Sequence, residues 1–243
     1  MKMKEELRKN KLGLFNRQKS QYLWLSSLLI ALTSILYISD KFIFQKYMGK
    51  LNPLITVPII ATLGFFSLSF LVSKNWISNH KDNNSKYLFY SSIITVILAS
   101  VMILVDLNKI AFSENINILF PKSLLFYPVI GFVAEIIFHI FPFTLLVLLF
   151  GYFLKNPNNN KIIWTSILIV SLVEPIFHIV DMSSGQQNSF WLLGYIGIHI
   201  CLFNFLQLYT LKRNGFIAMY LLRMIYYLIW HILWGYLRLN ILF

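Results

Sequence analysis

The sequence of 243 residues contains little charge. Only 12% of its residues are charged, and 58% are hydrophobic. An ordinary soluble domain has roughly 25% charged residues. So few charged side chains cannot cover a globular core of this size with a polar surface. The composition therefore excludes a water-soluble globular protein and predicts that much of the apolar surface faces lipid.

Cysteine is scarce as well. The single cysteine, Cys201, lies inside an apolar run, which excludes an intrachain disulfide and a site built from several cysteines. We expect it to be a small packing residue. No small-residue cleavage site follows the first apolar run, so we interpret that run as an uncleaved membrane anchor.

Long apolar runs are abundant, and seven have the length of about 20 residues that a helix needs to cross a bilayer. They cover residues 22–39, 54–72, 87–107, 126–154, 162–180, 190–211 and 216–239. The predicted fold class is an all-α polytopic transmembrane bundle of seven or eight helices. The eighth would be a short helix around Phe120, Pro121 and Pro128, where the long fourth run can be broken.

The sequence predicts one integral membrane domain, residues 21–243, after a basic cytoplasmic segment, residues 1–20. Within that segment, residues 5–19 fit either an interfacial amphipathic helix or a disordered tail. With the N-terminus inside, 14 basic residues lie on the inner side and six on the outer side. This bias predicts a cytoplasmic N-terminus, and we expect the plasma membrane. The net charge of +12 is then a topology signal, so we expect lipid, and no nucleic acid, as a partner.

Ionisable side chains inside the runs are the candidate functional groups, because they are costly in a bilayer. Of nine acidic residues only two lie well inside apolar runs, whereas four of the five histidines do. They are Glu135, His139, Glu174, His178, His199 and His231. Each glutamate precedes a histidine by four residues, which places each pair on one helical face. The alternation of spans predicts that all six face one water-accessible cavity in one half of the bilayer; alternatively, each pair neutralises a buried charge within the bundle.

The order of these residues also resembles a known family. The relevant positions are Ala134, Glu135 and His139, then Glu174 and His178, then His231 and Gly235. Over residues 128–239 they resemble the CPBP (Abi) family of intramembrane proteases, which includes type II CAAX prenyl endopeptidases. The family pattern is E-E-x-x-x-R, then F-x-x-x-H, then H-x-x-x-N on separate membrane helices. The chain keeps the second glutamate and both motif histidines, and it differs at the other positions.

The resemblance implies a peptidase that cuts a membrane-associated or lipid-modified peptide or protein. Peptide hydrolysis needs a base, a donor for the oxyanion and shelter from solvent. Glu135 would be the base, and His139 would adjust its affinity for protons. His178 and His231 would hold the water or stabilise the oxyanion, and Glu174 would orient His178. The donor missing at position 235 could come from another residue, and the candidates are Trp230, Trp234, Tyr226, Tyr227 and Arg223.

Other interpretations stay open at this point. No cofactor is expected, but zinc or iron could bind to Glu135, His139, Glu174, His178, His199 and His231. Di-iron bundle sites space Glu and His three residues apart, not four as here. We expect Arg223 to extend to the membrane interface, the alternative being a role in binding an anion or oxyanion. We expect Asn204 to form a hydrogen bond between helices.

Two function classes remain. The first is the intramembrane peptidase. The second is a catalytically impaired scaffold, immunity or regulatory protein on the same fold, in which the polar cluster holds helices together. A transporter is disfavoured, because the two halves of the chain show no matched pair of helices broken by Gly or Pro.

Overall fold

Seven membrane-length helices dominate the structure, which is a computed structural model. It describes residues 2–74, 76–77, 85–109, 112, 116–153, 159–185 and 190–243. Within these ranges the spans are Arg17–Ser39, Pro53–Ser73, Ser85–Asn108, Ser123–Phe153, Asn160–Ser183, Phe190–Asn214 and Phe216–Leu242. Each predicted run lies on one of them, and no strand is present among the described residues. The predicted all-α bundle is therefore confirmed.

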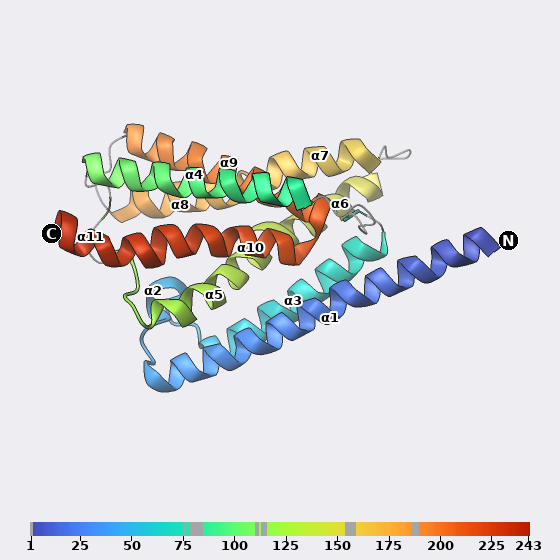
Figure 1. Ribbon diagram of the computed structural model, residues 1–243, viewed down its shortest axis with the longest axis horizontal. Helices are drawn as coiled ribbons and strands as arrows, with labels where there is room; N and C mark the ends of the chain where they lie inside the picture. The colour runs from blue at the N-terminus through green and yellow to red at the C-terminus, as the bar shows by residue number, and fades with distance from the viewer. Residues whose placement is uncertain are drawn as a thin grey trace.

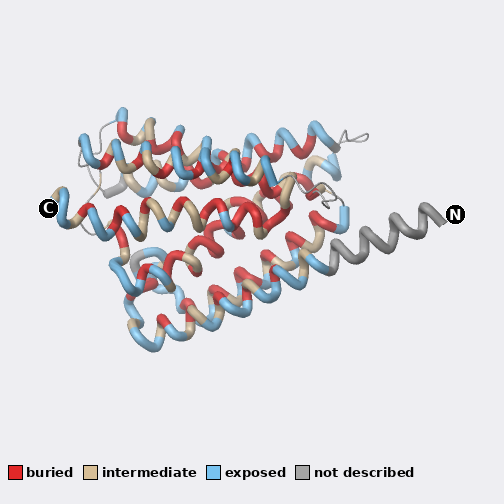
Figure 2. Tube along the Cα trace, viewed as in Figure 1, coloured by how far each residue is buried: buried red, intermediate tan, exposed pale blue. Residues whose placement is uncertain are grey.

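The outward faces of the helices are apolar. In α4 (Ser85–Lys109) only 22% of the most apolar window is buried inside the bundle. Figure 2 shows buried and exposed stretches alternating along most of the helices, as expected where one face of a helix packs in the bundle and the other lies outside it. Exposed side chains include Ile38, Phe66 and Phe190. Water would not tolerate so much exposed apolar surface, so the chain is an integral membrane protein.

Helices α1 (Lys2–Ser39) and α3 (Pro53–Ser73) lie side by side along one edge of the bundle (Figure 1). Helix α10 (Phe216–Tyr227) lies in the middle and contacts α4, α5 (Ser123–Ala134) and α9 (Phe190–Asn214). Helix α1 is unbroken, so residues 5–19 extend the first span as backbone helix. They form neither a separate interfacial helix nor a disordered tail.

The remaining elements divide or follow the spans. They are α2 (Gln45–Met48), η2 (Glu135–Ile140), α6 (Phe141–Phe153), α7 (Asn159–Val170), α8 (Val173–Gly185), η3 (Leu228–Trp234) and α11 (Gly235–Leu242). Helix α2 has four residues and lies in the first connection, so it is not the eighth helix that the sequence predicted near Pro121.

A salt bridge and a cap organise the connection between α1 and α3. The Lys122 ammonium, just before α5, lies 2.7 Å from a carboxylate oxygen of Asp40, just after α1. The hydrogen bond from Lys122 holds the pKa of Asp40 below its ordinary value. Helix α3 begins where the Asn52 side chain accepts the Leu54 N–H at 3.0 Å, with Pro53 at the first helical position.

The fourth span is irregular at its centre and not at its start. Helix α5 passes through Pro128 without a break, so the predicted break there is wrong. The irregular segment is instead the π-helix η2, after which the Phe141 N–H bonds to the Ile136 carbonyl, five residues back. Pro142 follows immediately and has no N–H for the ordinary α-helical bond. A π-helical turn shifts the hydrogen-bond register just before this proline.

The fifth span is divided by a turn at Ser171 and Leu172, between α7 and α8. Pro175 cannot donate to the Ser171 carbonyl four residues earlier, because proline lacks an N–H. The Asn204 amide on α9 donates to that carbonyl instead, at 3.4 Å. The predicted role of Asn204 as a hydrogen bonder between helices is confirmed. The break places Glu174 in the first turn of α8, where a negative charge is favoured.

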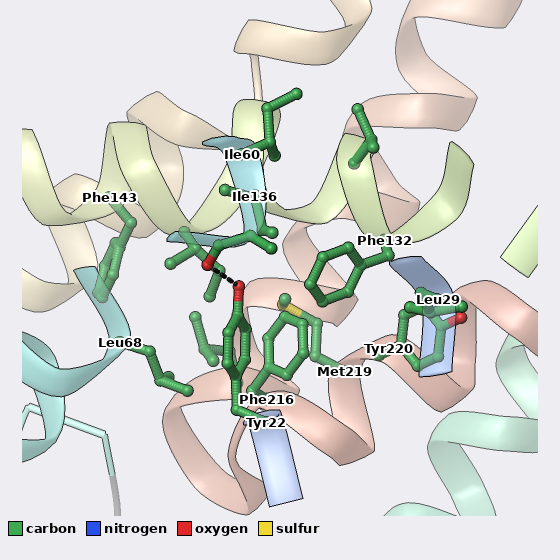
Figure 3. Close-up of a cluster of buried hydrophobic side chains, with 14 of the residues drawn as sticks. Tyr22, Leu29, Ile60, Leu68, Phe132, Ile136, Phe143, Phe216, Met219 and Tyr220 are labelled. Carbon is green, nitrogen blue, oxygen red and sulfur yellow. Dashed lines mark hydrogen bonds between the residues drawn. The ribbon is translucent and has the colours of Figure 1, made fainter. Parts of the chain in front are cut away.

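Aromatic rings fill the core where α1, α3, α5, η2 and α10 meet (Figure 3). The Tyr22 ring lies 5.1 Å from that of Phe216 and 5.6 Å from that of Phe132, centre to centre. The Tyr22 hydroxyl donates to the Ala61 carbonyl at 2.7 Å. Gly64 permits this close packing, because a Cβ there would lie 2.8 Å from Ile136 and in contact with the Tyr22 hydroxyl.

Gly64→Ala should therefore destabilise the protein. Overpacking of this kind costs about 1–3 kcal/mol, partly offset by the better helix propensity of alanine. The matched control is Gly194→Ala in α9, where an added Cβ has nothing within 4 Å. Thermal unfolding in detergent should show a lower midpoint for Gly64→Ala than for wild type, and no decrease for Gly194→Ala. Equal midpoints for the two variants would contradict the close packing at Gly64.

Candidate functional site

Arg223 on α10 lies at the centre of a buried polar cluster. The side chain is 2% exposed, so the expectation that it reaches the membrane interface is wrong. Its Nε donates to Glu135 at 2.6 Å, while Nη1 and Nη2 donate to the two carboxylate oxygens of Glu174, each at 2.9 Å. One guanidinium thus bridges two carboxylates from different spans. Such bidentate, charge-assisted contacts are among the strongest that protein side chains form.

The hairpin at Gly215 explains how α9 also joins this cluster. Gly215 has φ +85°, a left-handed conformation that glycine adopts readily, and it joins α9 to α10 directly. Gln207 and Arg223 each lie eight residues from this turn, so the antiparallel helices bring them to a similar depth. The side-chain oxygen Oε1 of Gln207 accepts from Arg223 at 3.2 Å, and the side-chain nitrogen Nε2 donates to Glu135.

Both carboxylate oxygens of Glu135 are occupied by protein donors. Oε1 accepts from Arg223 and Gln207, and Oε2 lies 2.7 Å from Nδ1 of His139. The predicted pairing of Glu135 with His139 on one face is therefore present, although η2 is π-helical. Neither side chain has any exposed surface. This half of the predicted site is closed to water.

The second predicted pair, Glu174 and His178, extends from the buried cluster to the outer surface of the bundle. Nε2 of His178 lies 3.9 Å from Oε1 of Glu174, and the His178 side chain is 42% exposed, whereas that of Glu174 is only 6% exposed. On the inner side, Nε2 of His139 lies 3.8 Å from Oε2 of Glu174 and has no hydrogen-bond partner. Glu174 thus lies between a buried histidine and an exposed one.

The other two predicted histidines lie in separate polar groups. His199 is bonded to tyrosines, with its Nε2 2.9 Å from the Tyr226 hydroxyl and its Nδ1 3.4 Å from that of Tyr195. His231 has its Nδ1 2.7 Å from Oδ1 of Asn117. The prediction that all six residues share one water-accessible cavity is therefore wrong. Four of them gather at Arg223, and the six are spread over three groups.

Asn117, in the connection before α5, lies beside His231. A Cβ on Gly235 would lie 2.9 Å from Nδ2 of Asn117, so the glycine leaves room for this side chain. The Asn117 carbonyl oxygen accepts from His231 and from the Tyr127 hydroxyl, the latter at 3.3 Å. The Tyr127 and His231 rings are stacked, with centres 4.6 Å apart. Asn117 thus occupies space that a side chain at position 235 would otherwise fill.

The donor set does not resemble a metal centre. Among the residues that the structure describes, no group of three or more His, Cys, Asp or Glu side chains is arranged to hold a metal ion. In the cluster, the Arg223 guanidinium lies between the two glutamates that would otherwise be the natural ligands. A cation at that point would be repelled by the guanidinium.

Sequence reasoning missed Gln207, Asn117 and a second buried ion pair. Gln207 is polar within an apolar run, so the criterion that selected the histidines could have found it. Asn117 lies in a connection, where polar residues are ordinary and give no signal. In the second ion pair, Arg238 of α11 contacts Asp106 of α4 at 2.9 Å, and both side chains are fully buried. Each lies near the end of its run, where a charged residue is expected to face solvent.

No family model, curated protein or solved structure matches the chain. The chemistry of the site is therefore argued from its geometry. That geometry joins four spans, through Glu135 and His139 on η2, Glu174 on α8, Gln207 on α9 and Arg223 on α10.

Arg223→Met should destabilise the fold strongly, because it leaves two buried carboxylates without their counter-ion. Removing one partner of a buried ion pair costs about 3–5 kcal/mol. Arg213→Met is the matched control, since Arg213 lies partly exposed at the end of α9 over the Tyr87 ring. Unfolding by denaturant in mixed micelles should show a much larger loss for Arg223→Met. A loss no greater than that of Arg213→Met would contradict the central position of Arg223.

Proposed function

We propose that the chain is a non-catalytic multi-pass membrane protein with a peptidase-like arrangement of helices, acting as a regulatory or immunity partner of a membrane-associated peptide or protein. The observation that carries this proposal is the enclosure of Glu135. Its two oxygens accept from Arg223, Gln207 and His139, and its side chain has no exposed surface. A general base must contact the water that it activates, and Glu135 has no surface exposed to water.

The positions of the other candidate residues favour the same function. His231 is engaged with Asn117 and His199 with Tyr226, in groups separate from Glu135. Hydrolysis needs the base and the oxyanion donors about 3 Å from one reacting atom. In contrast, the cluster at Arg223 is well suited to hold spans together, because its hydrogen bonds run between α8, α9, α10 and η2.

A second candidate function is the intramembrane peptidase itself, with Glu135, His178, His231, His139 and Glu174 as its catalytic residues. One observation favours it. The two π-helical segments of the described chain, η2 and η3, carry Glu135, His139 and His231. Such segments are common at functional sites. This function requires Glu135 to be released from Arg223 or Gln207 when a substrate enters.

A cleavage assay separates the two functions. Purified protein in lipid vesicles is incubated with membrane peptides, prenylated and unmodified, beside Glu135→Gln, which preserves the shape of the side chain. The regulatory proposal predicts no cleavage above that of empty vesicles by either protein. Cleavage by wild type that is lost in Glu135→Gln would overturn it and establish the peptidase. Loss of that cleavage with a chelator would indicate a zinc or iron enzyme.

We also propose that the N-terminus is cytoplasmic and that the protein lies in the plasma membrane. The bias of basic residues, 14 against six, supports this orientation. A cysteine at position 3, in a Cys201→Ala background, should react with a membrane-impermeant maleimide only after intact cells are permeabilised. Labelling in intact cells would place the N-terminus outside.

A further inference from the structure

The cluster around Arg223 contains more acidic than basic charge. Glu135 and Glu174 are both carboxylates, and Arg223 is the permanent cation in ion-pair contact with them in the described part of the chain. With His139 and His178 both neutral, the cluster would have a net charge of −1. Glu135 and Arg223 are at most 2% exposed, and an uncompensated charge in such an environment is costly. One additional proton removes the imbalance.

His139 is the group best placed to hold that proton. Its ring lies between the carboxylates, with Nδ1 2.7 Å from Glu135 and Nε2 3.8 Å from Glu174. A neutral ring has one N–H and one lone pair. It must therefore turn a lone pair toward one of the two anions. The doubly protonated ring instead presents an N–H to each, at hydrogen-bond distance from Glu135 and at ion-pair distance from Glu174.

The carboxylates are less suitable sites for the proton. Glu174 accepts both Nη groups of Arg223, and Glu135 accepts three donors, so protonating either would remove the charge that strengthens these hydrogen bonds. Nη2 of Arg223 does lie 3.5 Å from Nδ1 of His139. However, the shorter bonds of this nitrogen go to Glu174 at 2.9 Å and Gln207 at 3.2 Å.

The elements that carry the cluster hold four further charged or histidine side chains. Asp181 on α8 is exposed, His199 on α9 is hydrogen-bonded to tyrosines, and Lys212 and Arg213 lie in the last turn of α9. On α10 the Tyr227 hydroxyl accepts from Arg223 at 3.2 Å, and the Tyr220 hydroxyl donates to the Pro128 carbonyl at 3.0 Å. On α5 the Tyr127 hydroxyl is bonded to Asn117. Helix α3, which packs against η2, has no titratable side chain. His178 on α8 is partly exposed and has its Nε2 3.9 Å from Oε1 of Glu174.

We propose that Glu135, Glu174, Arg223 and His139 form an intramembrane proton-binding site, in which His139 holds the proton and His178 is its entry from the surface. His178 lies five residues before the end of its span at Ser183, so the proton moves from water at that end to His178, then through Glu174 to His139. The gaps of 3.9 Å and 3.8 Å on either side of Glu174 require a small rotation of a side chain or a bridging water. This inference goes beyond the regulatory proposal and does not depend on it.

The direct test is imidazole nitrogen NMR on the full-length protein in lipid discs, with histidines labelled and assigned by single His→Gln variants. Near neutral pH, His139 should show both nitrogens protonated, whereas His199, which is hydrogen-bonded to Tyr195 and Tyr226, should be neutral. In Glu174→Gln, where Arg223 alone balances Glu135, His139 should become neutral. A neutral His139 in wild type, or a charged His139 that Glu174→Gln does not change, would overturn the site.

The entry role of His178 has its own readout. After a rapid decrease in pH from the alkaline side, His178→Gln should take up the proton at His139 at least about tenfold more slowly, with the same final state, because a relay group is removed and the charge balance is not. His231→Gln is the control and should leave the rate unchanged. An unchanged rate in His178→Gln would exclude this entry. A negative result in these experiments leaves the cleavage assay unaffected, because the two kinds of experiment measure different properties of the cluster.

Discussion

The neutralisation of buried charge by Arg223 is the constraint on which the rest of the structure depends. Glu135 and Glu174 come from different spans and would repel each other in a low-dielectric interior, but one guanidinium contacts both at 2.6–2.9 Å. The contacts are directional, so they determine how far each helix is rotated as well as how closely it packs. Gln207 and His139 complete the arrangement with further hydrogen bonds to Glu135.

Prolines create the irregular backbone that makes these contacts possible. Pro142 follows the π-helical turn that carries Glu135 and His139, and Pro175 follows the break that places Glu174 at the start of α8. In the second case the carbonyl freed at Ser171 is satisfied by Asn204 from α9. A bond between helices therefore satisfies the carbonyl that the proline leaves free, as a bilayer requires of a backbone polar group.

Much of the fold could be predicted from the sequence, because a lipid environment makes hydropathy and length decisive. The seven runs correspond to the seven spans, and the pairing of Glu135 with His139 follows from their spacing alone. The role of Arg223 could not be derived this way. It lies seven residues after the start of α10, a distance that fits either an arginine reaching the interface or one facing the core. Which occurs depends on partners from other spans.

The connections were the other limit of prediction. Asn117 lies outside every apolar run, yet it is buried against Gly235 and bonded to His231. A loop residue of this kind gives no periodic signal, so its tertiary position is unpredictable from pattern. The positions of Asp106 and Arg238 were also not predicted. They lie near the ends of their runs, where either solvent or a buried partner is possible, and they form a fully buried ion pair.

A double-mutant cycle between Arg223 and Glu174 tests the central claim most directly. The free energy of unfolding in lipid is measured for wild type, Arg223→Met, Glu174→Gln and the double variant. Close charge pairs in buried sites give coupling energies above about 1.5 kcal/mol. We predict a coupling of at least that size, with the double variant more stable than the sum of the single losses implies. Additive losses would show that Arg223 does not hold the two carboxylates together.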